Sequence, residues 1–405
     1  MIAQIDMARI WYRWLHRCCN WLYFSRVTVL HAERLPESGP TIYLGLHRNG
    51  AVDGFIYHCV VPRATFMLST QLRRKLLGRL FFTGIEVVRD RDEGNQTNNQ
   101  AALAKCLEHL RAGRALFVFP EGTSSLGPRH LPFKSGAARL LAQYLERPDP
   151  IHVVPLGIIY ERGWAFRSRV EVVVGEPVSV ESLHTLETVG RVKELRQRIL
   201  SGLESVGVNV ASEHDQKLVE QLACVATLGT RRSYFKSLKA FERGVPEKIL
   251  SAWRTLQPER ETKALLFYQD VALFPGGSVW VNALALLLAA PPVAAGALFN
   301  FPPLVAGWWA GTKFPDGPNV VSLWRILVGV PVSVIWLLMI SAAAVGTRRP
   351  LWLGCYLLIS LVGLKLYCRV KKLAVAVHNG IRHPELRARM VAFHETVLHE
   401  IPDEE

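Results

Sequence analysis

Cysteine is scarce in this sequence and follows no metal-binding or disulfide pattern. The 405 residues include 7 cysteines, which form neither a CxxC pair nor a cluster with histidines at the spacing of zinc ligands. Because the number is odd, the cysteines cannot all pair with one another within one chain. We therefore expect reduced thiols in a cytoplasm-like compartment, and no structural zinc, at Cys18, Cys19, Cys59, Cys106, Cys224, Cys355 and Cys368.

The N-terminus lacks the features of a secretory signal peptide, since it has no uninterrupted apolar core and no cleavage site. Residues 1–25 instead carry apolar and basic residues at helical spacing. A helix with tryptophan on one face and arginine on the other is typical of the membrane interface. A helix packed on the following domain would show the same pattern, so both interpretations stay open. The apolar positions are Ile10, Trp11, Trp14, Leu15, Trp21 and Leu22, and the basic ones are Arg9, Arg13, His16 and Arg17.

Acidic residues are outnumbered by basic ones. The chain has 34 Asp and Glu against 48 Lys and Arg, which gives a net charge of +14, and 50% of its residues are hydrophobic. A basic and apolar chain favours a partner that is anionic and apolar, as a membrane surface is. No nucleic-acid recognition motif is present, so we expect no nucleic acid among the partners.

Long apolar runs are confined to the C-terminal third, at residues 278–298, 319–345 and 351–364, and Arg325 is the single charged residue in them. About 20 apolar residues suffice to cross a bilayer. We expect residues 271–372 to be embedded in a membrane, with the middle run spanning it and the short third run as a hairpin partner. The first run contains Pro291-Pro292 and could be kinked or re-entrant. The alternative is a set of helices buried in a large soluble core.

The remaining chain divides by pattern into three regions. Residues 26–183 alternate strand and helix patterns, which predicts an α/β domain with a mostly parallel sheet flanked by helices. Residues 184–270 are helical and charged and predict a helical extension. Residues 373–405 predict an amphipathic helix that ends in an acidic tail.

A histidine and a carboxylate follow the first buried strand of the α/β region. In LGLHRNGAVDGF, a strand over residues 41–46 ends at His47, and Asp53 follows six positions later. A carboxylate that orients a histidine makes it a competent general base, and the carboxyl ends of parallel strands are where α/β enzymes keep their chemistry. No Ser or Cys lies between the two residues, so the base would act on a hydroxyl of the substrate.

Two arginines follow a second short strand. Gly84 opens a strand over residues 85–88, after which come Arg89 and Arg91. The planar guanidinium can donate two hydrogen bonds to a phosphate at once. A solvated charge cluster with the neighbouring acidic residues is the alternative.

A third strand, residues 115–119, runs into the sequence PEGTSS. Glu121 lies at the strand end, and Gly122 lets the backbone turn tightly or approach a ligand. A helix that begins near Phe133 adds positive potential for an anion. The residues that could hold a phosphate here are Gly122, Thr123, Ser124 and Lys134. The fourth segment is HVVPLGIIY, in which Pro155 predicts an edge strand, a bulge or the wall of a cleft.

These four segments, HRNGAVD, GIEVVRDR, FPEGTSS and VVPLGII, resemble in order the four motif blocks of the glycerolipid acyltransferase family. That family comprises the glycerol-3-phosphate and 1-acylglycerol-3-phosphate acyltransferases, and the resemblance covers about residues 40–180. It implies a glycerol-3-phosphate acyltransferase-like fold, with His47 as the base and Asp53 as its partner. It also implies no cofactor or metal, and acyl-CoA or acyl carrier protein as the co-substrate. The substrate-binding residues that it implies are Arg89, Arg91, Glu121, Gly122, Thr123, Ser124, Lys134 and Pro155.

Three departures from the family pattern concern the acyl acceptor. The first block reads H-x5-D, one residue longer than usual, which the turn would have to absorb at Gly50. The second block has an arginine one place early and another one place late. Ser124 stands where the family has arginine, so Arg129 or Lys134 would have to compensate.

We therefore expect a membrane-bound O-acyltransferase of phospholipid biosynthesis whose catalytic domain faces the cytoplasm. It would transfer a fatty acyl group to a hydroxyl of glycerol-3-phosphate or of a lysophospholipid, 1-acylglycerol-3-phosphate. The departures motivate one alternative, a non-catalytic lipid-binding or scaffold protein that retains the pocket. A transporter built on the C-terminal runs is a further alternative, but it would require paired charges at mid-membrane depth.

Overall fold

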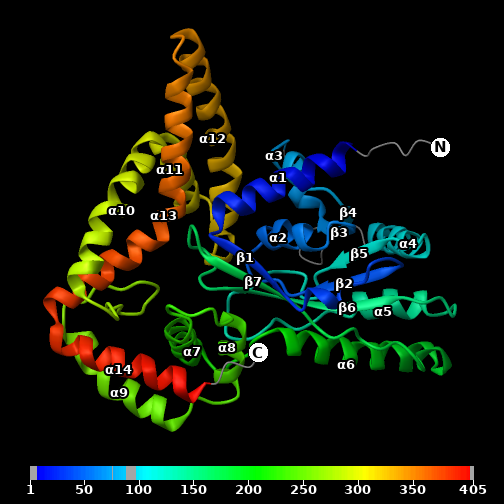
Figure 1. The fold of residues 1–405 in the computed structure, drawn as a ribbon. Coiled ribbons are helices and arrows are strands. Elements are labelled where there is room, and N and C mark those ends of the chain that lie inside the picture. The colour runs from blue at the N-terminus through cyan, green and yellow to red at the C-terminus, as the bar shows by residue number, and fades with distance from the viewer. Residues whose placement is uncertain (1–6, 75, 88–96, 402–405) are drawn as a thin grey trace. The chain divides into compact units, whose positions relative to one another are not determined.

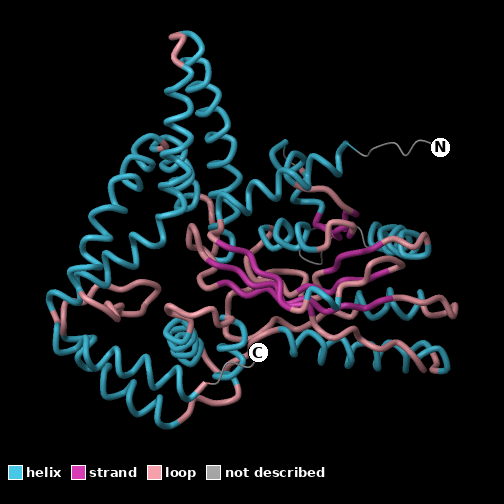
Figure 2. The backbone as a smooth tube through the Cα atoms, viewed as in Figure 1, coloured by secondary structure: helices cyan, strands magenta, loops and turns pink. Residues whose placement is uncertain are grey.

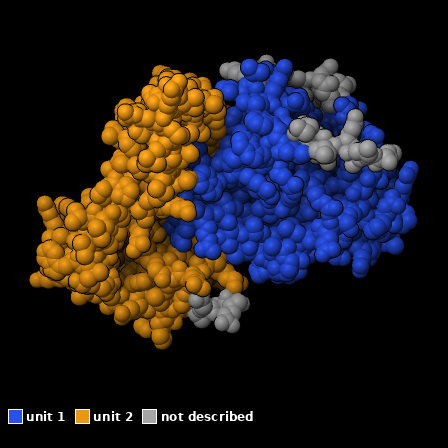
Figure 3. All heavy atoms as spheres, turned by 45° about the horizontal axis from the view of Figure 1, so that its top comes forward, with its two compact units in different colours: residues 1–209, 316–323 blue, residues 210–315, 324–405 orange. Residues whose placement is uncertain are grey.

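The computed structural model describes residues 7–74, 76–87 and 97–401 (Figures 1 and 2). The chain divides into two compact units, coloured in Figure 3. The first comprises Met1–Asn209 with the short segment Asp316–Leu323, and the second comprises Val210–Pro315 with Trp324–Glu405.

A seven-stranded sheet forms the centre of the first unit, in the order β1-β7-β6-β2-β5-β3-β4. All neighbouring strands are parallel except β6 and β7, which are antiparallel. The predicted mostly parallel sheet is thus confirmed. The strands are β1 (Arg26–Leu30), β2 (Thr41–Gly45), β3 (Ala64–Ser69), β4 (Ile85–Val87), β5 (Ala115–Val118), β6 (His152–Tyr160) and β7 (Arg169–Val174).

Helices cover both faces of this sheet, which is why β2 and β5 are buried along their whole length and read as unbroken apolar runs. Side chains alternate between the faces. Beside Gly45 of β2 lies the ring of Tyr57 from α2, whereas beside Gly157 of β6 lies Val206 from α6. Figure 1 shows α1 and α2 on one face and α5 and α6 on the other. The helices of this unit are α1 (Met7–Tyr23), η1 (Ala32–Arg34), α2 (Val52–Val60), η2 (Thr70–Arg73), α3 (Leu76–Phe81), α4 (Thr97–Arg111), α5 (Gly136–Tyr144), η3 (Leu183–Thr185), α6 (Thr188–Val206) and η4 (Pro318–Val320).

The first unit extends further than the predicted domain end at residue 183. Helix α6 packs on the sheet through Val206 and through Gly202, which faces the ring of Pro155. The compact unit consequently ends at Asn209. The many charged residues of α6 favoured a separate helical extension, but the helix also has a buried apolar stripe that includes Leu195 and Leu203.

Helix α1 packs on its own domain, as one of the two interpretations of its pattern predicted, and its membrane contact stays a prediction. Leu15, His16 and Cys19 are buried, whereas Trp11 and Trp14 are exposed. The grouping of His16 with the arginines of the basic face is wrong, because that side chain packs against α2 and stacks on Phe55 with ring centroids 4.4 Å apart.

The second unit is helical. Its α10 runs unbroken through Pro291 and Pro292, and the third apolar run is part of the 33-residue α13 rather than a short hairpin partner. Three helices, Val279–Phe299, Pro318–Gly346 and Pro350–Arg382, are long and apolar enough to cross a membrane. The helices are α7 (Glu213–Ala226), α8 (Tyr234–Glu242), α9 (Glu247–Thr262), α10 (Val279–Phe299), α11 (Phe301–Lys313), α12 (Val321–Gly346), α13 (Pro350–Arg382) and α14 (Pro384–Glu400).

Glycines let helices of the second unit approach closely. A Cβ on Gly296 of α10 would lie 3.5 Å from the Cα of Gly363 on α13, and one on Gly307 of α11 would lie 3.7 Å from the Cα of Gly329 on α12. Small residues at such crossings are typical of helix pairs in lipid, where close van der Waals packing replaces the hydrophobic effect.

Candidate active site

His47 follows the carboxyl end of β2, and Asp53 lies in the first turn of α2. The intervening turn includes Gly50, whose φ of +55° absorbs the extra residue of the H-x5-D spacing. As a result His47 Nδ1 lies 2.9 Å from Asp53 Oδ2. The imidazole also stacks on Phe119, with ring centroids 4.2 Å apart and planes inclined by 25°. The two contacts fix the ring orientation.

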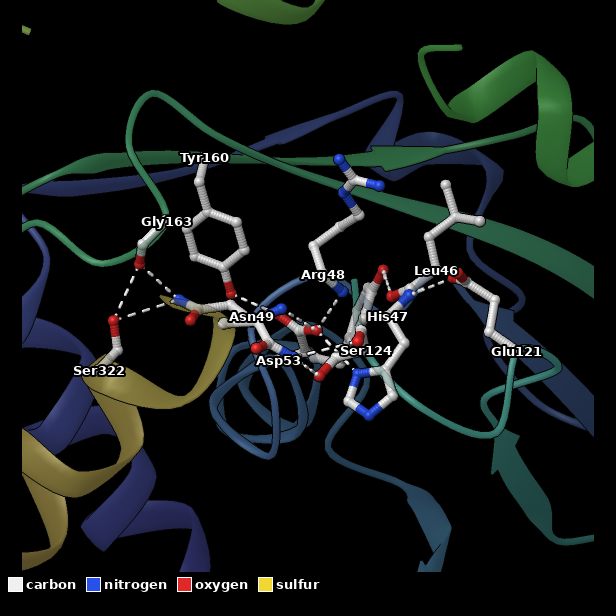
Figure 4. A network of polar contacts seen from close by, with 12 residues as sticks. Leu46, His47, Arg48, Asn49, Asp53, Glu121, Ser124, Tyr160, Gly163 and Ser322 are labelled. Carbon is white, nitrogen blue, oxygen red and sulfur yellow. Dashed lines mark hydrogen bonds and ion pairs between the residues drawn. The ribbon is translucent and has the colours of Figure 1, made fainter. Parts of the chain in front are cut away.

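Asp53 is fully buried and saturated with hydrogen bonds. Besides His47, its Oδ2 accepts the backbone N–H groups of Arg48 at 2.6 Å and Asn49 at 2.8 Å. Its Oδ1 accepts the hydroxyl of Tyr160 at 2.5 Å, as Figure 4 shows. Burial, and then the adjacent Asp53 charge, hold the pKa of Tyr160 well above its usual value. Tyr160 therefore remains a donor to Asp53.

Glu121 fastens the end of β2 to the loop that follows β5. Its Oε1 accepts the backbone N–H of His47 at 2.7 Å, and its Oε2 accepts that of Leu131 at 3.0 Å. Burial raises the pKa of this carboxyl, while the two N–H groups oppose the rise. The family resemblance implies that Glu121 binds substrate, and Glu121 lines the same pocket as His47. Its two hydrogen bonds also position the backbone of His47 and of the loop after β5.

The PEGTSS loop wraps around His47. The backbone N–H of Ser125 donates to the carbonyl of His47 at 3.0 Å. Gly122 has a φ of +70°, and a Cβ there would lie 3.1 Å from Cε of Lys134. Glycine is thus required both for the turn and for the passage of the Lys134 side chain across it.

A segment distant in the sequence completes the loop. The amide nitrogen of Asn319 donates to the carbonyl of Ser124 at 3.0 Å and to its hydroxyl at 2.7 Å. Ser322 and Asn49 both donate to the carbonyl of Gly163, at 2.9 and 2.6 Å. Figure 4 shows Asn49 beside the Asp53 network. Residues 316–323 therefore support both the turn that contains Asn49 and the loop that contains Ser124, whose hydroxyl accepts a hydrogen bond from Asn319.

His47 lines a pocket of about 1260 Å³. The part of its wall that comes from the loop after β5 and from residues 316–319 is polar, with Glu121, Thr123, Lys134, Asp316 and Asn319. The part that comes from α2, from β3 and β4 and from the chain between these strands is largely apolar. It includes Phe55, Phe66, Met67, Leu68, Leu72, Phe82, Ile85 and Val87. A ligand with a charged head and an apolar tail matches this arrangement.

The structure gathers most of the predicted site residues around this pocket. His47, Glu121, Gly122, Thr123, Ser124 and Lys134 line it, with Asp53 directly behind His47. Lys134 is in place to compensate for the motif arginine, whereas Arg129 is not among the lining residues. Arg89 and Arg91 lie outside the described residues.

Pro155 does not join the site. Strand β6 lies inside the sheet, between β7 and β2, so the edge-strand interpretation of Pro155 is wrong. The ring of Pro155 faces Gly202 of α6, on the opposite side of the sheet from α2. The chain beyond β7 bulges beside Pro155. Gly175 donates to the carbonyl of Pro155, and Val178 donates to that of Val153. Three steps along this chain therefore face only two steps along β6. This bulge accommodates the missing N–H.

Sequence reasoning missed Tyr160, Asn49 and Asn319. Tyr160 had a usable signal, since it ends a strand parallel to β2 and so reaches the same edge of the sheet. Asn319 had none, because it stands at the start of an apolar run. Within the described residues, no group of three His, Cys, Asp or Glu side chains could hold a metal ion.

The Asn319 contacts predict a measurable loss of turnover in Asn319→Ala. Without its two hydrogen bonds the Ser124 loop loosens beside His47. At about 1 kcal/mol for each hydrogen bond, we expect kcat/KM to fall by up to about thirtyfold. Asn282→Ala is the matched control, because the Asn282 amide bonds only the carbonyl of Ser278 in its own helix. Equal kcat/KM values for the two variants would contradict the supporting role of Asn319.

A buried histidine pair lines the same pocket. His16 Nδ1 and His58 Nδ1 are 2.9 Å apart, and His16 Nε2 lies 2.8 Å from the carbonyl of Phe81. Burial lowers the pKa of His16 to about 3 and that of His58 to about 4. Both rings are thus neutral at pH 7, and one can donate to the other.

The lowered pKa values predict that acid destabilises the protein. Below about pH 6.5 the unfolded chain binds protons that the folded pair binds only near pH 4 and below. Stability is therefore complete above pH 6.5 and falls toward pH 4, by up to about 1.4 kcal/mol per pH unit for each histidine. The apparent melting temperature in detergent should fall between pH 7 and 4.5, less steeply in His58→Gln. If the melting temperature of His58→Gln fell with pH as steeply as that of the exposed-site control His152→Gln, the histidine pair would not be the cause of the acid sensitivity.

Comparisons with known proteins match the catalytic unit. Residues 26–159 match the family model described as Acyltransferase. The chain is 34% identical over 125 residues to glycerol-3-phosphate O-acyltransferase 1 of Saccharomyces cerevisiae, and this match covers 29% of this chain and 16% of that protein. It is 26% identical over 164 residues to a 1-acyl-sn-glycerol-3-phosphate acyltransferase of Chlamydomonas reinhardtii, and this match covers 40% of this chain and 47% of that protein. The chain thus spans less than half the length of these two relatives.

A solved structure also resembles part of the chain. It is the 1-acyl-sn-glycerophosphate acyltransferase PlsC from Thermotoga maritima, with a TM-score of 0.36 and 20% sequence identity. The match covers 51% of this chain and 84% of that one.

Proposed function

The chain belongs, through residues 26–159, to the glycerolipid acyltransferase family, and from this premise we propose that it transfers a fatty acyl group to a hydroxyl of a glycerophosphate. The acceptor is glycerol-3-phosphate or 1-acylglycerol-3-phosphate, and the donor is acyl-CoA or acyl carrier protein. The observation that carries the proposal is the His47–Asp53 pair, held at 2.9 Å and opening on a pocket whose wall has a polar and an apolar part.

His47 acts as the general base. When its Nδ1–H donates to Asp53, the lone pair of the neutral ring lies on Nε2, directed away from the carboxylate (Figure 4). Nε2 accepts the proton of the acceptor hydroxyl as the oxygen attacks the thioester carbonyl. The new C–O bond forms, the C–S bond breaks, and the imidazolium returns the proton to the leaving thiolate. The buried Asp53 carboxylate stabilises the imidazolium between these steps.

The polar part of the pocket wall holds the phosphate of the acceptor. Lys134 supplies a positive charge, and Thr123 and Ser124 supply backbone N–H groups and hydroxyls in the same wall, while the N–H of Gly122 donates to the carbonyl of Phe119. Charge-assisted hydrogen bonds of this kind are the strong ones for a phosphate. The apolar part of the wall, with Phe55, Phe66 and Phe82, suits the acyl chain.

We also propose that the protein is membrane-bound and works in phospholipid synthesis, with its catalytic unit on the cytoplasmic side. Three helices have the length and composition to span a bilayer. Lys371 and Lys372 lie in the C-terminal part of α13, where long basic side chains reach the headgroup level. The odd number of free cysteines is consistent with a reducing compartment.

The direct test offers the purified full-length protein in detergent a radiolabelled acyl-CoA and, separately, a labelled acyl carrier protein. Glycerol-3-phosphate and 1-acylglycerol-3-phosphate are supplied in separate reactions. Lysophosphatidate as product assigns the first acylation step, and phosphatidate from the lysolipid assigns the second. Absence of product with every donor and acceptor pair would overturn the proposal and support the non-catalytic scaffold.

A further inference from the structure

A second pocket, of about 400 Å³, lies at the other edge of the sheet from His47. It opens where β2 and β5 begin, at Thr41 and Ala115. The catalytic residues follow the carboxyl ends of the same two strands. The second pocket is therefore no part of the acyl-transfer site.

This pocket is rich in unpaired positive charge. Arg13 of α1, Arg63 of the turn before β3 and Arg114 of the turn before β5 all line it, and none of its lining residues is acidic. Among the described residues, none of the three guanidinium groups has a hydrogen-bond or ion-pair partner. Other arginines of the unit do find carboxylates, as Arg34 does with Glu176 and Arg169 with Glu161. Three unpaired like charges around one pocket favour an anion.

The hydroxyl of a tyrosine is available at the same pocket. Tyr43 of β2 lines the pocket and is 5% exposed as a whole residue. Its hydroxyl has no hydrogen-bond partner in the described part of the chain, so it can donate to a ligand in the pocket. Burial raises its pKa, and the charge of Arg63 opposes the rise, so the two groups are neighbours on the pocket wall.

The apolar surroundings indicate where the anion comes from. Ile10 of α1 lines the pocket and is 51% exposed, and Trp14, one turn further, is 57% exposed. Helix α3 extends this surface with the exposed side chain of Leu76. The two helices are joined where Tyr12 donates to the carbonyl of Arg79 at 2.7 Å. Exposed tryptophan and aliphatic side chains beside arginines are typical of a surface that lies on a bilayer.

We propose that this pocket binds the phosphate of an anionic phospholipid headgroup while the exposed faces of α1 and α3 rest in the interfacial layer. The guanidinium groups of Arg63 and Arg114 donate to the phosphate oxygens, and the Tyr43 hydroxyl donates to the same group. Arg63 also lines the long pocket, so the bound lipid lies next to the apolar part of the acyl-transfer site. The assignment does not depend on acyl transfer itself.

The test measures lipid binding by the full-length protein in an uncharged detergent at physiological salt. Calorimetric titrations use dihexanoyl phosphatidylglycerol and, as the zwitterionic comparison, dihexanoyl phosphatidylcholine. We expect the anionic lipid to bind more tightly, and Arg63→Gln/Arg114→Gln to weaken its binding about tenfold or more, as expected for lost charge-assisted hydrogen bonds. The charge-matched control is Arg111→Gln/Arg139→Gln, which removes two exposed arginines outside both pockets.

Three outcomes would overturn the proposal. An equal loss of phosphatidylglycerol affinity in both double variants would mean that net charge alone attracts the lipid. Unchanged binding in Arg63→Gln/Arg114→Gln would mean that the pocket is not the site. A parallel titration with CoA and dephospho-CoA covers the remaining source of phosphate: a loss of CoA affinity with full retention of phosphatidylglycerol would assign the pocket to the acyl donor.

Discussion

His47→Ala is expected to lower kcat by a factor of about 10²–10⁴, the usual contribution of a general base. The reason is geometric: the ring that alanine removes is the one whose Nδ1 lies 2.9 Å from Asp53 and whose Nε2 is free to accept a proton. KM should change little, because the phosphate-binding wall is formed by the PEGTSS loop and Lys134. The measurement is initial rate against acceptor concentration, with the wild type in parallel.

The control for this prediction is His152→Ala. His152 is exposed and lies at the first residue of β6, at the opposite edge of the sheet. Its loss should leave kcat within about twofold, as is usual for surface substitutions. If His47→Ala kept more than a tenth of the wild-type kcat while His152→Ala behaved normally, another group would have to be the base.

Asp53→Asn is expected to reduce kcat about a hundredfold or more while the protein stays folded. An asparagine can place its oxygen at the Oδ2 position, where it still accepts from His47 Nδ1 and from the two backbone N–H groups. Its NH₂ group then meets Tyr160, whose hydroxyl can rotate to accept. The geometry survives, but the negative charge that stabilises the imidazolium is lost.

Asp53→Ala provides the contrast. It leaves the N–H groups of Arg48 and Asn49 and the hydroxyl of Tyr160 without their acceptor in a buried site. Each unsatisfied buried group costs about 1–3 kcal/mol, so this variant should melt several degrees lower than Asp53→Asn. Melting curves and kcat values for the two variants separate the roles of charge and scaffold. An Asp53→Asn enzyme with wild-type kcat would show that the charge has no part in catalysis.

The candidate site has a supporting layer in which His47 and Ser124 are each held by another segment of the chain. Glu121 holds the backbone of His47, Ser125 donates to the same residue, and Asn319 holds Ser124. A serine at position 124 has a direct explanation in this arrangement, since its hydroxyl receives a hydrogen bond from the segment that precedes α12. Lys134 is then the cation of the wall that we propose binds the phosphate.

The pattern of apolar runs and turns was sufficient to predict the sheet and the position of the main site. A strand covered on both faces must be apolar throughout, so β2, β5 and β6 were readable as strands. Because parallel strands share one carboxyl edge, polar residues after two of them had to converge, and His47 and Glu121 do. The contact between His47 and Asp53 could also be predicted, because a glycine in the turn between them, Gly50, can adopt a positive φ and so bring the two side chains together.

Other features depend on contacts between residues far apart in the chain, which leave no periodic signal. Pro155 has the appearance of a site residue, yet side-chain alternation along β6 sends its ring to the α6 face. His16 has the composition of a polar face, yet it is buried because α1 turns that face onto α2.

The sequence by itself determined the α/β class, the His47–Asp53 pair, the loop after β5 and the three apolar helices, because each depends on a local pattern of a few to about 30 residues. Only the tertiary structure decided that Tyr160 closes the Asp53 network, that Asn319 supports Ser124 from almost 200 residues away, and that Arg13, Arg63 and Arg114 line one pocket. The physical reason is the same in each case. These side chains owe their function to neighbours brought by folding, and long-range packing of that kind is set by the whole chain rather than by any one segment.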